Sequence, residues 1–217
     1  MTAPYLARMI PRMTENLTEL IELWSLCSER LRSGSSNTTA FNAMDDIRLA
    51  SIDVISSITF GSSFNNIRAA VELLETEPEA DSSTRPPTSP LSHALEEILN
   101  IIGNNMLFPL PAWLTWWTKT FDTNWNRARK LLYDFLEERL DGARMVYESS
   151  GSRYDDPDAR TADNVLDMIL EKERGEHLKG SEGLSRSEIL DELAMFALGG
   201  SESMYQYCTS VLCESDA

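Results

Sequence analysis

The chain has 217 residues, of which 35 are acidic and 19 basic, so its formal net charge is -16 at pH 7. Such a charge argues against a nucleic-acid partner, because phosphate contacts need clustered Lys and Arg. An apolar content of 42% is ordinary for a globular protein, and a chain of this length can bury a substantial core. We therefore expect a globular protein that does not bind nucleic acid.

The cysteines and histidines predict neither a metal site nor a disulfide framework. The number of cysteines is odd, none has the paired C-x-x-C spacing, and the two histidines lie far apart in the sequence. No stretch reaches the roughly 18 apolar residues of a membrane span, and the amino terminus lacks a basic segment followed by an apolar core. We expect a cytosol-facing protein with no membrane anchor in these residues.

Apolar residues recur every three or four positions in the first half of the chain, which indicates amphipathic helices. We predict helices over residues 14–31, 41–60, 65–74 and 91–102. Residues 77–90 collect proline, serine and charge and are predicted to form a loop.

The second half continues the helical pattern. A long helix is predicted over 127–147 and a short one over 163–170, and the charged segment 171–183 is predicted to be a loop. A last helix begins at Ser185, because Ser185 and Glu188 have the spacing of a capping box. No run alternates in polarity, so the predicted class is all-α, with about six to eight helices and no sizeable sheet.

Three tryptophans, Trp113, Trp116 and Trp117, gather between prolines and basic residues. Amphipathic aromatic and basic side chains are favoured at a membrane interface, which makes this cluster a candidate for peripheral membrane contact. The same aromatic side chains equally suit packing against another part of a protein core. The sequence leaves both interpretations open.

The most informative stretch is Asp191–Met204, an apolar helix that runs into Gly199 and Gly200, with Glu202 and Ser203 following. Glycine inside a helix costs about 1 kcal/mol relative to alanine, so a pair of glycines indicates a cap, a kink or the close approach of another group. A helix end followed by a polar tail is the simplest alternative. A hydroxyl and a carboxylate released from helix bonding can also hold water that relays protons.

This stretch resembles the oxygen-binding kink of the cytochrome P450 haem-thiolate monooxygenases, whose central helix carries a small residue, Gly, any residue, an acid and Thr. The segment Asp45–Gly61 looks like the family helix that ends on Val-Ile and Phe-Gly. The order of Val165–Leu170, a charged loop and Leu184–Ile189 resembles the approach to the central helix. The resemblance covers nearly the whole chain up to Met204 and is closest to the fungal, microsome-associated type.

The resemblance implies roles for four residues. Gly199 and Gly200 would lie at the haem face, and Glu202 and Ser203 would assist proton delivery to bound oxygen. The family's usual alcohol is Thr, so Ser203 keeps the hydroxyl but lacks the stiffening methyl. The complete family protein would use haem, oxygen and an electron-donating reductase to oxidise a small organic substrate, and members are often anchored in the endoplasmic reticulum membrane.

The resemblance also implies a haem iron held by a cysteine thiolate, in a loop with Phe, Gly and Arg before the cysteine and Gly after it. None of Cys27, Cys208 and Cys213 has that context, so no metal ligand is predicted. We expect a P450 fragment that is inactive alone, with a partial domain at 1–204 and a divergent tail at 205–217. The alternative is a non-enzymatic helical module that holds a partner helix in an apolar groove.

Overall fold

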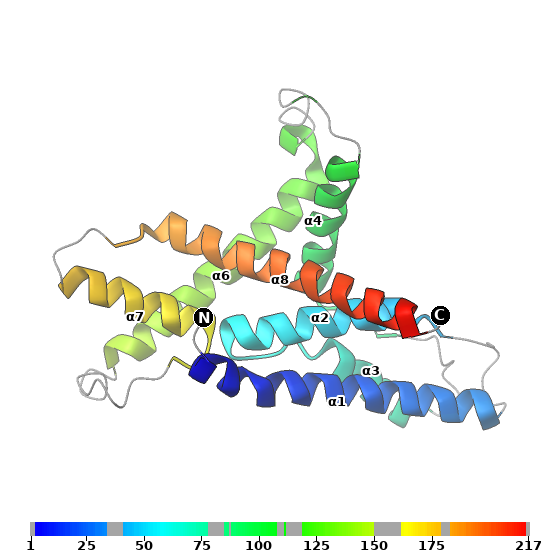
Figure 1. Ribbon diagram of the computed structural model, residues 1–217. Helices are drawn as coiled ribbons and strands as arrows, with labels where there is room; N and C mark the ends of the chain where they lie inside the picture. The colour runs from blue at the N-terminus through cyan, green and yellow to red at the C-terminus, as the bar shows by residue number, and fades with distance from the viewer. Residues whose placement is uncertain are drawn as a thin grey trace. The chain divides into compact units, whose positions relative to one another are not determined.

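A computed structural model describes residues 3–33, 41–77, 85–86, 88–107, 111, 119–149, 162–178 and 183–215. The regular elements in these ranges are helices, namely α1 (Ala3–Ser33), α2 (Ala43–Phe60), α3 (Asn66–Thr76), α4 (Pro90–Leu107), α6 (Thr123–Ser149), α7 (Val165–Leu178) and α8 (Arg186–Ser215) (Figure 1). No strand occurs in the described ranges. The predicted all-α class is confirmed.

The helices form two compact units. The first unit comprises Met1–Thr88 and Gly199–Ala217, and the second comprises Ser89–Leu198, so that α8 contributes its second half to the first unit and its first half to the second. In the first unit α1 packs against α2 and α3, and in the second α4 packs along α6 (Figure 1). The division into a domain at 1–204 and a tail at 205–217 stays a prediction.

The core of the first unit is a cluster of side chains from α1, α2 and α3. Its members are Leu20, Leu23, Cys27, Ile47, Leu49, Ala50, Ile67, Ala70, Val71 and Leu74. Fully burying a Leu or Ile side chain contributes about 1.5–3 kcal/mol, so a cluster of this size fixes three amphipathic helices against one another. These three helices carry the buried polar groups described below.

The first helix starts earlier than predicted. α1 begins at Ala3 and contains Pro11, although proline removes one helix hydrogen bond. Met9 is only 2% exposed, and Nη1 of Arg12 donates to the carbonyl of Ser57 at 3.1 Å. These tertiary contacts hold the turn around the proline, and a prediction from local signals does not include them.

α6 also starts earlier than the predicted residue 127. It begins at Thr123, because the carboxylate of Asp122 accepts hydrogen bonds from the backbone amides of Asn124 and Trp125 at 2.9 and 3.1 Å. An aspartate in this position satisfies amides that have no partner within the helix. The cap therefore sets the start of α6 before its apolar periodicity begins.

The loop predicted over 171–183 is wrong in its first part, since α7 runs to Leu178. Nη2 of Arg144 on α6 donates to both carboxylate oxygens of Glu173 at 2.9 and 3.1 Å. Hydrogen bonds between charged groups are stronger than those between neutral groups. This bridge between two helices supports a charged turn that has too few apolar residues to be recognised as helical.

The predicted start of the last helix is confirmed. The amide of Ser185 donates to the carboxylate of Glu188 at 2.7 Å, and the amide of Glu188 donates to the hydroxyl of Ser185 at 3.3 Å. The hydrogen bonds from Ser185 lower the pKa of Glu188. Within the second unit, Arg186 makes two hydrogen bonds to the carboxylate of Asp141 at 2.6 and 2.9 Å, which tie α8 to α6.

Candidate functional site

Gly199 and Gly200 lie inside a continuous helix. α8 runs from Arg186 to Ser215 without interruption, and among the described glycines it is Gly61 that has a positive φ. A helix that ends in a glycine cap usually places that glycine in the left-handed conformation. The simplest alternative, a helix end at Gly199 followed by a polar tail, is therefore wrong.

The two glycines differ in their surroundings. A Cβ on Gly200 would lie 2.8 Å from Cδ1 of Ile55, with Cγ1 and Cγ2 of the same side chain at 3.2 and 3.3 Å. A Cβ on Gly199 would have nothing within 4 Å. Gly200 thus lets α8 approach α2 closely within the first unit, whereas Gly199 leaves open space on another side of the helix.

Ser203 and Glu202 are both exposed but have different partners. The hydroxyl of Ser203 donates to the carbonyl of Gly199 at 2.7 Å, and the carboxylate of Glu202 accepts from Nε2 of Gln206 at 2.7 Å. A serine oxygen that donates its proton still has two lone pairs with which to accept. Within α8, the Ser203 hydroxyl is therefore bound to the preceding turn, at Gly199, and the Glu202 carboxylate is bound to the following turn, at Gln206.

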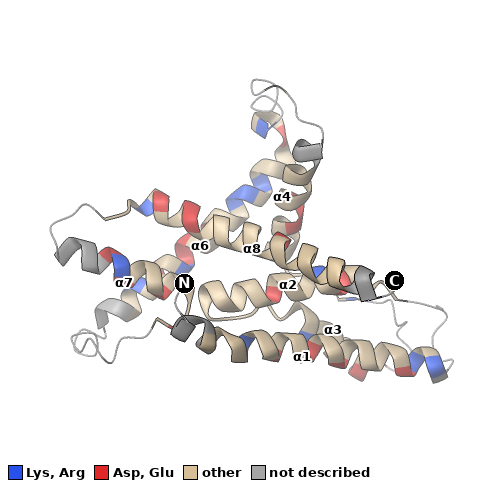
Figure 2. Ribbon diagram, in the orientation of Figure 1, with Lys and Arg blue, Asp and Glu red and all other residues tan. Residues whose placement is uncertain are grey.

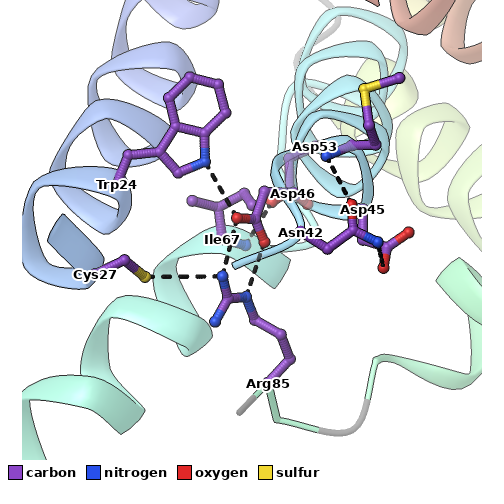
Figure 3. A network of polar contacts seen from close by, with 9 residues as sticks. Trp24, Cys27, Asn42, Asp45, Asp46, Asp53, Ile67 and Arg85 are labelled. Atoms are coloured by element: carbon purple, nitrogen blue, oxygen red, sulfur yellow. Dashed lines mark hydrogen bonds and ion pairs between the residues drawn. The ribbon is translucent and has the colours of Figure 1, made fainter. Parts of the chain in front are cut away.

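A buried charge cluster that the sequence did not predict surrounds Asp46 at the start of α2 (Figure 3). Nε and Nη2 of Arg85 donate to the two oxygens of Asp46 at 2.8 and 2.9 Å, and Nε1 of Trp24 donates to one of them at 3.1 Å. Nη2 of Arg85 also lies 3.8 Å from Sγ of Cys27. Because Arg85 is remote in the sequence, no local signal could have revealed this pair.

A second buried carboxylate, Asp53, is 0% exposed and caps a neighbouring helix. It accepts from the amide of Ile67 at 3.0 Å and from Nδ2 of Asn66 at 2.8 Å. Asn65 gives α3 no side-chain cap, so α2 supplies the missing acceptor from a distance. Burial raises the pKa of Asp53 above its ordinary value, although the hydrogen bonds from Ile67 and Asn66 oppose the rise.

The raised pKa of Asp53 predicts a pH dependence of stability. The folded state holds the proton of the Asp53 carboxyl group more tightly than the unfolded state does. The stability contributed by the protonated Asp53 is therefore fully present below the unfolded pKa, about 3.9, and is lost as the pH rises through the folded pKa. We expect Asp53→Asn to flatten the fall of the unfolding free energy over that range, measured by urea unfolding at a series of pH values. Asp45→Asn, in the same helix but exposed, is the matched control; an unchanged slope for Asp53→Asn would contradict the assignment.

Comparison with known proteins identifies the family. The model of the family described as Cytochrome P450 matches residues 3–212. The chain belongs to the cytochrome P450 family. No curated protein and no solved structure matches the chain. The family match includes the segment Gly199–Ser203 and extends past Met204. Enzymes of the P450 family are monooxygenases that use haem, an organic substrate and an electron-donating reductase.

The described thiols of this P450 chain do not fit the role of axial haem ligand. Cys27 is 0% exposed, and burial raises its pKa although Arg85 opposes the rise, which disfavours the thiolate that binds iron. Cys208 lies in the wall of an apolar pocket, and the side chain of Cys213 is outside the described part. In the described ranges no group of three or more His, Cys, Asp or Glu could hold a metal ion.

None of the helices that the structure describes combines the length and the apolar character needed to span a bilayer. Trp113, Trp116 and Trp117 lie outside the described residues. Their peripheral contact with a membrane stays a prediction.

Proposed function

We propose that α8 supplies the oxygen-activation helix of a P450 monooxygenase, with Ser203 and Glu202 assisting proton delivery. The observation that supports this role is the hydrogen bond of 2.7 Å from the Ser203 hydroxyl to the Gly199 carbonyl. It fixes the hydroxyl one turn from the glycine that has open space beside it. Gly199 and Gly200 then form the stretch that borders the cofactor, and the contact of Gly200 with Ile55 keeps that stretch in place.

The chemistry of the two side chains suits proton transfer. The oxygen of Ser203 can accept a hydrogen bond from a water molecule while its own proton is held by the Gly199 carbonyl. The exposed carboxyl group of Glu202 can take up a proton from solvent and pass it to such a water molecule, which returns Glu202 to its carboxylate form. A carboxylate and a hydroxyl joined by water form a relay along the helix surface. The hydrogen bond to Gly199 restrains the Ser203 side chain, which lacks the methyl group of the family's usual Thr.

The proposal is tested by the coupling between reductant use and product formation in a complete P450 enzyme that carries residues 186–215 of this chain. We expect Ser203→Ala to lower the product formed per reductant consumed by about 10-fold or more, because general acid-base groups contribute at least that much. Ser203→Thr should retain the coupling.

Ser210 provides the matched control for this experiment. Its hydroxyl is also exposed and donates to a carbonyl four residues earlier, that of Gln206, at 2.9 Å. Ser210→Ala should leave the coupling unchanged. If Ser203→Ala and Ser210→Ala have equal effects, Ser203 has no special part in proton delivery.

We also propose that the 217 residues alone are not an active monooxygenase. No cysteine has the sequence context of the family's ligand loop, and the environment of Cys27 favours a protonated thiol. The proposal concerns the polypeptide by itself and is independent of the role of Ser203.

A further inference from the structure

Glu202 has no charged partner in its part of α8. In the segment 199–211 it is the only Asp, Glu, Lys or Arg, and Figure 2 shows that most other charged positions of α8 gather toward its start. None of the ion pairs in the described ranges includes Glu202. The guanidinium of Arg48 on α2 lies 5.0 Å from the ring centroid of Tyr205, where the face of the ring attracts it. The orientation of the Glu202 carboxylate therefore depends on uncharged neighbours.

Gln206 binds this carboxylate from the following turn of the helix. Its Nε2 donates to Oε1 of Glu202 at 2.7 Å, and residues four apart lie on neighbouring turns of one helix face. Exposed Glu and Gln side chains have several rotatable bonds and adopt many conformations when nothing restrains them. The hydrogen bond favours one conformation of each, and because Glu202 is exposed, its other oxygen stays open to water.

The hydrogen bond turns the carboxylate toward the side of α8 that carries Gly199 and Ser203. In a helix of about 3.6 residues per turn, Gln206 lies about 40° around the axis from Glu202. Gly199 and Ser203 lie about 60° and about 100° from Glu202 in the same direction. An unrestrained carboxylate would point to the opposite side as readily. Gln206 thus directs it toward the hydroxyl with which it is proposed to share a water molecule.

We propose that Gln206 is a positioning residue for proton delivery, which holds the Glu202 carboxylate where it can pass a proton to water bound at Ser203. This inference rests on the proposed role of Glu202 and Ser203. The side-chain amide of Gln206 donates a hydrogen bond but does not ionise, so Gln206 acts only through Glu202. The position requires a hydrogen-bond donor of this length and not the amide itself.

The contact itself is tested in the purified 217-residue chain. The side-chain amide signals of Gln206 in a nitrogen–proton NMR spectrum are assigned by their loss in Gln206→Met. They should shift in Glu202→Met, because the charged acceptor of that amide is then absent. Glu192→Met is the matched control, since Glu192 is exposed on the same helix, and it should leave the signals unchanged. Signals that do not move in Glu202→Met would overturn the proposal.

The functional test uses the complete P450 enzyme that carries residues 186–215 of this chain. Gln206→Met keeps the length and the helix propensity of the side chain but removes its donor. We expect it to lower the product formed per reductant consumed by about two-fold, the effect of losing a hydrogen bond at this spacing. Gln206→Lys should retain the parent value, because a Lys four residues after a Glu is a favourable pair. Ser210→Met, at an exposed position one turn further, should also leave it unchanged.

A double substitution separates positioning from a general effect on the helix. In a Glu202→Met background, Gln206→Met should cause no further loss, because its effect passes through Glu202. An equal loss in both backgrounds would overturn the proposal. If Glu202→Met and Ser203→Ala lower the product yield and Gln206→Met does not, the proposal fails while proton delivery by Glu202 and Ser203 stands. If neither Glu202→Met nor Ser203→Ala changes the yield, the proposed function fails, and the role of Gln206 fails with it.

Discussion

Replacing Asp46 with alanine should lower the free energy of unfolding by about 3–5 kcal/mol, the usual effect of removing one partner of a buried ion pair. The side chain of Asp46 is 1% exposed and that of Arg85 is 17% exposed, so the substitution leaves a largely buried cation without its carboxylate. Trp24 also loses the acceptor of its indole N–H. Urea unfolding of the purified chain measures the loss.

Asp45 provides the control for this substitution. It is in the same first turn of α2 but is exposed, so Asp45→Ala should cost less than about 1 kcal/mol. Removing both partners of the buried pair should cost less than the sum of the two single changes, because no buried charge is then left alone. Equal losses for Asp46→Ala and Asp45→Ala would show that the network does not stabilise the fold.

The two glycines of α8 should respond to substitution in opposite directions. Gly199→Ala should raise the free energy of unfolding by about 0.5–1 kcal/mol, because alanine favours the helix and its methyl meets no neighbour. Gly200→Val should lower it by about 1–3 kcal/mol, because the added atoms overlap the side chain of Ile55. Thermal or urea unfolding of the two variants measures both effects.

A second substitution identifies the cause of the Gly200 effect. If the overlap with Ile55 is responsible, Ile55→Ala should cost less in the Gly200→Val background than in the parent, since it also removes the clash. Additive losses would mean that the overlap with Ile55 does not cause the Gly200 effect. A destabilised Gly199→Ala variant would contradict the open space beside Gly199.

The sequence allowed prediction of those parts of the fold that depend on neighbouring residues. The capping box of Ser185 and Glu188 gave the start of the last helix correctly. The predicted end of the second helix at residue 60 is confirmed, since Gly61 follows it with φ 76° and its amide donates to the carbonyl of Ser57 at 3.0 Å. Caps and glycine ends act within one turn, which is why they can be recognised without the structure.

Features that depend on distant residues could not be predicted. The helical turn at Glu173 rests on Arg144 of another helix, and the charge cluster of Asp46 rests on Arg85. Asp53 caps α3 from α2, so the sequence around Asn65 gives no sign of it. In each case the partner is brought close only by folding.

The candidate site was also only partly predictable. Resemblance singled out the segment Gly199–Ser203, but it treated the two glycines alike. Only the packing of α8 shows that Gly200 contacts Ile55 while Gly199 has open space. The hydrogen bond from the Ser203 hydroxyl to the Gly199 carbonyl is likewise seen only in the structure.

We propose that these 217 residues contain the oxygen-activation helix α8 but no cysteine thiolate that binds the haem iron. The most direct test is a carbon-monoxide difference spectrum of the purified, reduced chain after haem addition. We predict no thiolate-type spectrum, and the same result for a variant in which Cys27, Cys208 and Cys213 are all changed to Ser. A thiolate-type spectrum of the parent chain that disappears in the cysteine variant would contradict the account, because one of the three thiols would then ligate the iron.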